Sequence, residues 1–227
     1  MFLESFLMQY NKNIFDFYQS SGIYDRIIFR NRNKNNNNHL TIEKLIEKTL
    51  SLKCRYNKQC DQLVFSDGNN KSKIMMIGDA PGISDEINNK PFSGDVGLLL
   101  NKMLKAIKLD RTKVYLTNII NFRLQDNRKL SDYDIKIFKP LIYEHIEIIN
   151  PKLIMLFGTS ALKTFFNNEE SISKVRGKWL NLKIKNNTYS CMPSFHPNFL
   201  INQPSQKINS WQDLKEFKIR IDKDKLC

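Results

Sequence analysis

Short, mostly apolar runs alternate with amphipathic segments along most of the chain, and this alternation constrains the fold more than any other feature of the sequence. Such runs are typical of strands buried on both faces, and apolar residues at helical spacing between them predict covering helices. We expect strands at residues 73–78, 113–119, 153–158 and 188–192. Alternating strands and helices favour a parallel sheet with helices on both faces. The sequence therefore predicts an α/β fold around a central, mainly parallel four-stranded sheet.

The expected helices lie between and after these strands. Residues 95–107 place most of their apolar side chains close to one helical face, and helices are also expected at residues 160–166 and 204–222. Ser131 with Asp134 resembles a capping box at the start of a long helix. Because the carboxyl ends of parallel strands meet at one edge of a sheet, ligand-binding residues should lie in the loops that follow the strands.

The chain divides into a main domain and an N-terminal appendage. We expect a helical extension at residues 1–30, an asparagine-rich linker followed by a helix at residues 31–50, and the main domain at residues 51–227. The N-terminus has neither a basic segment nor a small-residue cleavage site, so it does not resemble a signal peptide. No apolar run reaches the roughly 18 residues of a spanning helix. We therefore expect a cytoplasmic protein whose four cysteines are free thiols, and we expect it to be a monomer.

The chain carries a strong excess of positive charge. It has 36 Lys and Arg residues against 23 Asp and Glu residues, a formal net charge of +13. An excess of this size favours a polyanionic partner, with nucleic acid ahead of a membrane surface. A composition rich in lysine, asparagine and isoleucine also arises in A/T-biased genomes, so charge alone leaves both explanations open.

Polar and aromatic residues gather in the loops where the predicted strands end. The first strand runs into the tight turn Gly78–Gly82, which carries Asp79, and a loop with Phe92 follows. The second strand runs into Asn118, and the fourth leads to His196. Each feature alone is also explained by a turn, a cap or a core side chain. Together they suit a planar heterocycle: the phenylalanine stacks on it, the asparagine and the histidine bond its polar edge, and the carboxylate handles water or developing positive charge.

Four motifs in these loops resemble those of the type 4 branch of the uracil-DNA glycosylase superfamily. They are GDAPG at residues 78–82, PFSG at residues 91–94, the segment from TN to NR at residues 117–128, and HPNFL at residues 196–200. The resemblance covers residues 50–227. It implies the three-layer α/β/α sandwich of these enzymes and a cytoplasmic, nucleoid-associated DNA repair enzyme. Such an enzyme flips uracil out of single- or double-stranded DNA and hydrolyses its N-glycosidic bond, leaving an abasic site.

The resemblance also implies a role for each residue around the flipped uracil. Phe92 would stack on the base, and Gly78 and Ala80 would also contact it. Asn118 would bond the O4 and N3 edge, which excludes cytosine because cytosine carries a donor where uracil has an acceptor. His196 would donate a hydrogen bond to O2 as negative charge builds on the leaving base.

Catalysis and DNA binding are implied for a second set of residues. Asp79, and with weaker support Asp85 and Asn127, would hold the attacking water or stabilise the sugar cation. The loop that begins at His196 would enter the minor groove, where a side chain at its end fills the gap that the base leaves. The residues expected to contact DNA are Pro81, Arg128, Pro197, Asn198, Phe199, Leu200 and Lys207, with Phe199 or Leu200 as the one that fills the gap.

The sequence departs from the family at the cysteines. Most type 4 enzymes ligate a [4Fe–4S] cluster with four cysteines, and the corresponding positions here are Ser51, Cys54, Phe122 and Phe138. A cluster needs four converging thiolates, and phenylalanine supplies none. We therefore predict that the cluster is absent, that no cofactor or metal is bound, and that aromatic packing bridges this region. Asp79 is a smaller departure, because the family has a glutamate there whose carboxylate reaches one methylene further.

Two other functions stay open. The shorter carboxylate at Asp79 is consistent with lost chemistry, which would leave a glycosylase fold that only binds nucleic acid. A sibling glycosylase with another base preference, such as hypoxanthine or xanthine, would keep the same fold and loops. Cleavage of a uracil-containing oligonucleotide separates uracil excision from both alternatives.

Overall fold

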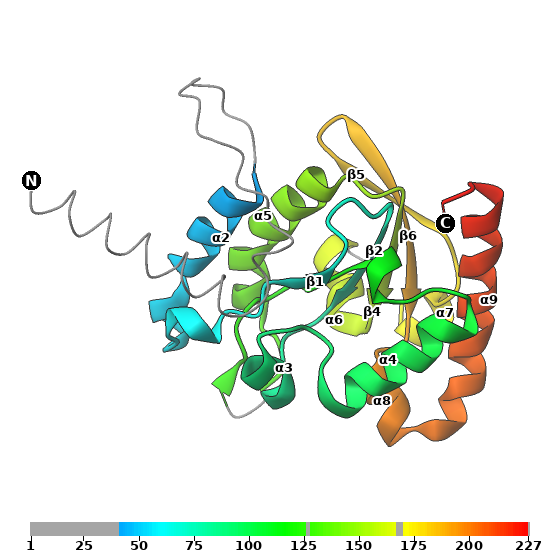
Figure 1. Ribbon diagram of the computed structural model, residues 1–227, viewed down its shortest axis with the longest axis horizontal. Helices are drawn as coiled ribbons and strands as arrows, with labels where there is room; N and C mark the ends of the chain where they lie inside the picture. The colour runs from blue at the N-terminus through cyan, green and yellow to red at the C-terminus, as the bar shows by residue number, and fades with distance from the viewer. Residues whose placement is uncertain (1–40, 126–127, 167–169, 227) are drawn as a thin grey trace, which may run out of the picture.

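A mixed β-sheet forms the centre of the computed structural model, which describes residues 41–125, 128–166 and 170–226 (Figure 1). Within these residues the sheet has six strands in the order β1-β3-β2-β4-β6-β5. The strands are β1 Ser66–Gly68, β2 Ile74–Gly78, β3 Tyr115–Asn118, β4 Leu153–Phe157, β5 Leu180–Ile184 and β6 Asn187–Ser194. Strands β3, β2, β4 and β6 run parallel to one another, and β1 and β5 pair antiparallel at the two edges.

The four expected strands are confirmed as the parallel part of the sheet, but the expected strand number of four is wrong. Two edge strands join the sheet within the described residues. Strand β1 is only three residues of Ser-Asp-Gly, too short and too polar to show a pattern. Strand β5 alternates, with Leu182 and Ile184 buried and Asn181 and Lys183 exposed, as an antiparallel edge strand with one solvated face does. Neither strand contains a continuous apolar run, so the sequence pattern did not predict them.

Helices cover both faces of the sheet, so the molecule has three layers. Alternate residues of the central strands point to opposite faces, and Met75 and Ile77 pack in a first core whereas Ile74 and Met76 pack in a second. The helices on the first core are α2 Ile42–Leu50, α5 Asp132–Ile149 and α6 Thr159–Phe165. The helices on the second core are α4 Gly94–Ala106, α8 Pro197–Asn202 and α9 Lys207–Lys223. The α/β/α architecture is confirmed.

The expected helices at residues 95–107, 160–166 and 204–222 correspond to α4, α6 and α9. The capping box is also present at the start of α5. The Asp134 backbone N–H donates to Ser131 Oγ at 3.2 Å, and the Ser131 backbone N–H donates to Asp134 Oδ2 at 2.9 Å. The remaining helical segments are η2 Lys53–Tyr56, η3 Cys60–Gln62, α3 Ile83–Asn88, η4 Arg111–Lys113, α7 Ile172–Val175 and η6 Pro204–Gln206.

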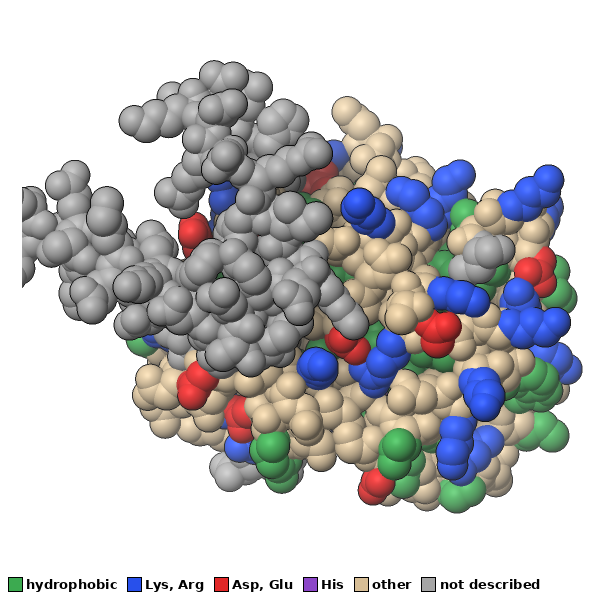
Figure 2. Space-filling model, in the orientation of Figure 1, with side chains coloured by type: hydrophobic (Ala, Val, Ile, Leu, Met, Phe, Trp, Pro, Cys, Tyr) green, Lys and Arg blue, Asp and Glu red, His purple; other side chains and the backbone are tan. Residues whose placement is uncertain are grey.

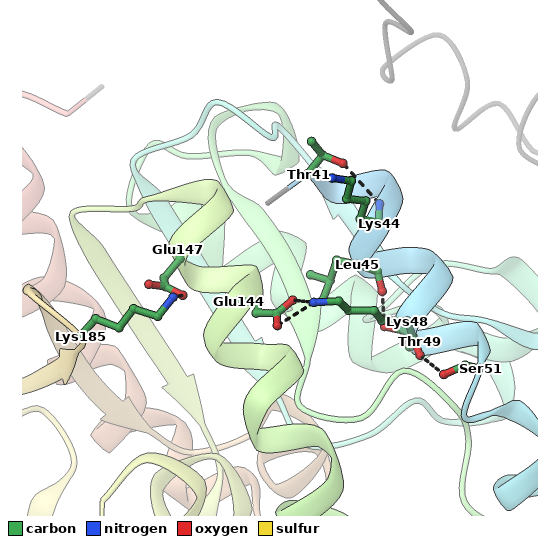
Figure 3. Close-up of polar contacts among 9 residues, drawn as sticks. All are labelled: Thr41, Lys44, Leu45, Lys48, Thr49, Ser51, Glu144, Glu147 and Lys185. Atoms are coloured by element: carbon green, nitrogen blue, oxygen red, sulfur yellow. Dashed lines mark hydrogen bonds and ion pairs between the residues drawn. The ribbon is translucent and has the colours of Figure 1, made fainter. Parts of the chain in front are cut away.

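Helix α2 confirms the helix expected at the end of residues 31–50, whereas the expected extension at residues 1–30 lies outside the described residues. The side chain of Thr41 caps α2 by accepting the Lys44 backbone N–H at 3.4 Å (Figure 3). Lys48 on α2 pairs with Glu144 on α5, with 2.7 Å between Nζ and Oε2 (Figure 3). The segment before the sheet is therefore docked on α5.

The loops that follow the parallel strands gather at one edge of the sheet, in the lower half of Figure 1, where α3, α4 and α8 lie. This is the edge at which the sequence predicts the ligand-binding residues. None of the helices in the described part of the chain is both long enough and apolar enough to cross a bilayer.

Candidate active site

Gly78, Phe92 and Asn118 meet where β2 and β3 end. Gly78 pairs with Asn118 in the strand register. A Cβ atom at Gly78 would lie 2.4 Å from Asn118 Oδ1 and 2.7 Å from Phe92 Cζ, so only glycine fits between these side chains. Asn118 is 2% exposed, and its Nδ2 has no hydrogen-bond partner among the described residues. Asn118 therefore offers a buried donor to a ligand.

Asp85 holds the loop that carries Phe92. Asp85 Oδ1 accepts the Ser93 backbone N–H at 2.6 Å, and Oδ2 accepts the Gly82 backbone N–H at 3.0 Å. Burial raises the pKa of Asp85, and the hydrogen bonds from the backbone N–H groups of Ser93, Gly82 and Phe92 oppose that shift. Both carboxylate oxygens are thus engaged in joining the GDAPG turn to the Phe92 loop.

His196 lies at the start of α8 and faces Phe92. The two rings stack with centroids 5.7 Å apart and planes at 23°. The Asn198 backbone N–H donates to His196 Nδ1 at 3.1 Å, so a neutral imidazole carries its proton on Nε2. Desolvation lowers the pKa of His196 to about 4. The ring is therefore neutral near pH 7 and presents one N–H donor, at Nε2.

Asp79 follows Gly78 and points toward the end of β4. Its Oδ1 accepts the Ala161 backbone N–H at 3.1 Å in the first turn of α6. Burial raises the pKa of Asp79 to about 6, although hydrogen bonds from Ala161 and Ser160 lower it. A Cβ atom at Gly158 would lie 3.1 Å from Asp79 Oδ2 and 3.4 Å from His196 Cβ, so the carboxylate and the histidine flank the same glycine.

These contacts join four of the predicted residues, and we call Asp79, Phe92, Asn118 and His196 the base site. Three of them lie in or beside loops that follow different parallel strands, and Phe92 lies between α3 and α4. They lie close together, although they are distant in sequence, because the carboxyl ends of parallel strands meet at one edge of the sheet. Ala80 is half-buried beside the base site and packs on the first core.

The residues expected to contact DNA differ in their exposure. Pro81 and Pro197 are buried, and Leu200, only 1% exposed, packs in the second core. Phe199 is 40% exposed, and its ring centroid lies 4.9 Å from that of Phe195. Of the two residues expected to fill the gap in DNA, Phe199 is the one whose side chain reaches the surface, and α8 uses Leu200 for packing.

The remaining predicted residues lie further along the same loops and helices. Asn198 and Lys207 are exposed, and Lys207 is the first residue of α9. Arg128 is exposed and binds Asp134 through both terminal nitrogens, at 2.5 and 3.0 Å. Asn127 lies outside the described residues, so its role stays a prediction.

A polar network behind His196 was missed by the sequence analysis. Ser194 Oγ donates to Asp213 Oδ2 at 2.8 Å, and Arg176 Nη2 lies 2.8 Å from Asp213 Oδ1. Arg176 also lies over the Phe195 ring, 5.6 Å from its centroid. The network ties the end of β6 to α9 immediately before His196. Asp213 lies within a helical pattern, where it resembles any surface aspartate until its burial is known.

The positions that the resemblance assigns to an iron–sulfur cluster do not fit one. Cys54 is an exposed free thiol, whereas Phe122 and Phe138 are fully buried. Both phenylalanines pack on Tyr56, with ring centroids 6.2 Å and 5.5 Å from the tyrosine ring. Among the residues that the structure describes, no group of three or more His, Cys, Asp or Glu side chains could hold a metal ion. The ring of Tyr56 connects Phe122 and Phe138 instead.

Comparison with known proteins decides the family. The family model of the uracil DNA glycosylase superfamily matches residues 65–215. The chain belongs to the uracil-DNA glycosylase superfamily. A type-4 uracil-DNA glycosylase of Sulfurisphaera tokodaii is 32% identical over 184 residues, which cover 78% of this chain and 84% of that protein. Proteins of the same name are 35% identical in Saccharolobus solfataricus, over 69% of this chain and 75% of that protein, and 30% identical in Thermotoga maritima, over 71% and 84%.

The match to the uracil-DNA glycosylase superfamily includes the whole base site. It begins one residue before β1 and ends within α9, so it contains all six strands of the described sheet. The first-core helix α2 lies outside it. Of the four positions that the resemblance assigns to the cluster, Ser51 and Cys54 precede the matched residues, and Phe122 and Phe138 lie within them.

Proposed function

We propose that this member of the superfamily is a DNA repair glycosylase that hydrolyses the bond between uracil and deoxyribose, acting as a cytoplasmic, nucleoid-associated monomer. The observation that carries the proposal is the buried Nδ2 of Asn118, which has no partner among the described residues and lies beside Phe92. A buried N–H group without an acceptor costs about 1–3 kcal/mol, and a bound base with a carbonyl oxygen removes that cost. The relatives' name, type-4 uracil-DNA glycosylase, supports the same function.

Asn118 selects uracil against cytosine through the direction of one hydrogen bond. Uracil places the O4 acceptor opposite the Nδ2 donor, whereas cytosine places its amino group there. Two facing donors leave both groups unpaired in a site that excludes water. At about 1–3 kcal/mol, this mismatch gives roughly tenfold to a hundredfold discrimination from a single contact.

His196 and Asp79 divide the chemistry between the base and the sugar. As the C1′–N1 bond breaks, its electron pair moves onto uracil, and O2 gains negative charge. The neutral His196 donates its Nε2 proton as a hydrogen bond to O2, which lowers the energy of the leaving anion. Water adds its oxygen to C1′ and releases a proton, which reaches the departing uracil anion through solvent, and Asp79 in its ionised form orients that water or stabilises the cationic sugar. A pKa of about 6 leaves Asp79 mostly ionised at pH 7.

Asp85 takes a different part from Asp79 in this proposal. Its two oxygens bind backbone N–H groups at 2.6 and 3.0 Å, so they are committed to the Phe92 loop and not to water. We therefore infer that Asp85 positions Phe92, and that Asp79 alone acts on the water or the sugar cation.

DNA binding requires positive charge and a side chain that replaces the flipped base. Figure 2 shows Lys and Arg side chains spread over the face drawn, as the net charge of +13 leads one to expect. Arg128, Asn198 and Lys207 are exposed and suit contacts to phosphate, and Phe199 suits the gap left by the base. Flipping a base costs a few kcal/mol, which phosphate contacts offset, so affinity should fall steeply with salt.

We propose further that the enzyme works without a [4Fe–4S] cluster. The packing of Phe122 and Phe138 on Tyr56 supports this, because it connects η2, the segment after β3 and α5 without a metal. Purified protein should be colourless and free of iron. A broad absorbance near roughly 400 nm with stoichiometric iron would contradict the proposal.

Cleavage of an oligonucleotide with one uracil tests the function. The oligonucleotide is presented single-stranded, opposite guanine and opposite adenine, and alkali reveals abasic sites. We expect wild-type protein to cut and Asn118→Ala to be slower by about a hundredfold. Asn187→Ala is the matched control, because Asn187 is exposed at the β5–β6 turn, at the amino end of β6. Equal cutting by Asn118→Ala and wild type would contradict the role of Asn118.

The same assay separates the alternatives. Binding to uracil-containing DNA without any cutting would favour a DNA-binding module that has lost its chemistry. Release of hypoxanthine or xanthine in place of uracil would favour a glycosylase with another base preference.

A further inference from the structure

Phe92 has a backbone conformation that a bulky residue rarely adopts. Its φ is 56°, in the left-handed region. A non-glycine residue there costs on the order of 1–3 kcal/mol, and it persists only when the surrounding structure determines it. The ring of this residue is 2% exposed and stacks on His196. Something must therefore hold the backbone of Phe92 so that its ring stays in the base site.

Arg111 binds the carbonyl side of this loop. Its Nη2 donates to the Phe92 carbonyl oxygen, and its Nη1 donates to the Pro91 carbonyl oxygen at 3.3 Å. Asp85 binds the opposite, N–H side of the same loop at Ser93. In the short segment around Phe92, the carbonyl oxygens thus bind the Arg111 guanidinium, and a backbone N–H group binds the Asp85 carboxylate.

Arg111 is itself fixed by two other elements. Its Nη1 lies 2.6 Å from Asp67 Oδ2 on β1, and its Nε donates to Asn101 Oδ1 on α4 at 2.8 Å. The guanidinium therefore bridges an edge strand, a helix and the Phe92 loop. Gly97 makes room for it, because a Cβ atom there would lie 2.1 Å from the Phe92 carbonyl oxygen and 3.2 Å from Arg111 Nη2.

We propose that Arg111 is a positioning residue for base recognition, which rests on the proposed function and extends it to a residue outside the base site. Arg111 keeps Phe92 in its left-handed conformation, and Phe92 then presents its ring face to the flipped uracil. Lysine keeps the charge but lacks the planar fork, so it cannot bond Asp67, Asn101 and the loop carbonyls together. Without the fork, Phe92 relaxes toward negative φ and its ring leaves the stacking position.

Arg111→Lys tests this proposal through activity and through uracil binding. A displacement of about 1 Å at a reacting site costs on the order of a hundredfold in rate. We expect kcat/KM on uracil-DNA to fall roughly tenfold to a hundredfold, and the Kd for free uracil to rise by a similar factor. Arg220→Lys is the matched control, because Arg220 also pairs with an aspartate but lies on α9. We expect it to match wild type. Thermal unfolding identifies variants that are unfolded at the assay temperature.

A double-mutant cycle separates positioning from a general structural role. If Arg111 acts through Phe92, Arg111→Lys should change kcat/KM by less than about threefold in a Phe92→Leu background, since contacting residues are non-additive. An equal loss in both backgrounds would overturn the proposal. Asn101→Ala removes one hydrogen-bond acceptor of the Arg111 guanidinium and leaves the charge of Arg111 unchanged. It therefore replaces Arg111→Lys in the cycle if Arg111→Lys does not fold. We then expect a loss of roughly twofold to fivefold that also disappears with Phe92→Leu.

The outcomes distinguish the two proposals. Wild-type protein that neither cuts uracil-DNA nor binds uracil would overturn the proposed function and this inference with it. Wild-type activity that Arg111→Lys leaves unchanged would overturn the inference alone.

Discussion

The base site and the aromatic cluster of Tyr56, Phe122 and Phe138 differ in how closely they follow the resemblance. The base site keeps a phenylalanine, an asparagine and a histidine at the positions that the family motifs assign to them. The aromatic cluster replaces two cysteine positions with rings that are fully buried. The difference follows from what each region must do. A base site has to match the donors and acceptors of one base, whereas a region that only connects elements can use any well-packed side chains.

The aromatic cluster is also polar at one edge. Tyr56 stacks on Phe122 at 19° between ring planes and meets Phe138 edge-on at 64°. Its hydroxyl donates to Asp134 Oδ1 at 3.0 Å. Asp134 in turn binds Arg128, one of the residues expected to contact DNA. The cluster therefore connects the segment before the sheet to the loop that carries Arg128.

The largest expected effect is on stability, in the aromatic cluster. Phe138→Ala removes a fully buried ring, so we expect the free energy of unfolding to fall by about 3–5 kcal/mol. Urea denaturation at pH 7 measures it. The kcat of the protein that remains folded should stay close to wild type. A stable Phe138→Ala variant with a much reduced kcat would contradict the separation between the two regions.

The second expected effect is on catalysis, in the base site. His196→Ala removes the donor that we propose for O2, so we expect kcat to fall by about a hundredfold to a thousandfold, equivalent to roughly 2.7–4 kcal/mol. Single-turnover cleavage of uracil-DNA measures it, and thermal unfolding should change little. His196→Gln retains an N–H donor and should recover part of the rate. Wild-type kcat in His196→Ala would remove the histidine from the mechanism.

The third expected effect concerns Asp134, which accepts a hydrogen bond from Tyr56 at the polar edge of the aromatic cluster. Burial raises the pKa of Asp134, but hydrogen bonds from Arg128, Ser131 and Tyr56 outweigh it and hold the pKa below its usual range. The folded-state pKa is thus below the unfolded value of about 3.9, so the carboxylate adds stability above about pH 4 that is lost as pH falls further. We expect Asp134→Asn to lose about 2 kcal/mol at pH 7 and less at pH 3, where the unfolded state already binds the proton and the folded state does not.

Urea denaturation at the two pH values checks this expectation. Asp132→Asn is the control, because Asp132 lies in the first turn of the same helix and is exposed. A loss that is the same at both pH values would show that the carboxylate charge of Asp134 contributes nothing.

The smallest effect is the pH dependence that Asp79 gives to the base site. Its pKa is raised to about 6 by burial, and the proposed mechanism requires the ionised form. We therefore expect kcat/KM to rise with pH, about tenfold per unit below pH 6, and to level off above it. His196, with a pKa of about 4, adds no step near neutral pH. Asp79→Asn should flatten the profile, and a flat wild-type profile from pH 5 to 8 would exclude Asp79 from this role.

The sequence predicted the parallel strands and the base site for related reasons. Continuous apolar runs identify strands such as β2 and β4, and parallel topology then places the residues after them at one edge. Asn118 and His196 lie where this reasoning puts them. The motif resemblance added the roles, which topology alone does not give.

Other features escaped the sequence for physical reasons. Strands β1 and β5 lie at the sheet edges, where pairing needs no continuous apolar run. Arg111 binds Asp67, and Asp213 binds Ser194, across long stretches of chain. No local spacing reveals such pairs, because they depend on the packed fold. The burial of Leu200 is of the same kind, since the pattern HPNFL does not say which apolar residue faces the core.

We expect the base site to excise uracil without a metal cluster. The most direct measurement is the amount of uracil released from a uracil-containing oligonucleotide, under single-turnover conditions, by a preparation whose iron content is determined in parallel. Iron-free protein should release one uracil per oligonucleotide. The absence of released uracil from folded, iron-free protein that binds the oligonucleotide would contradict it.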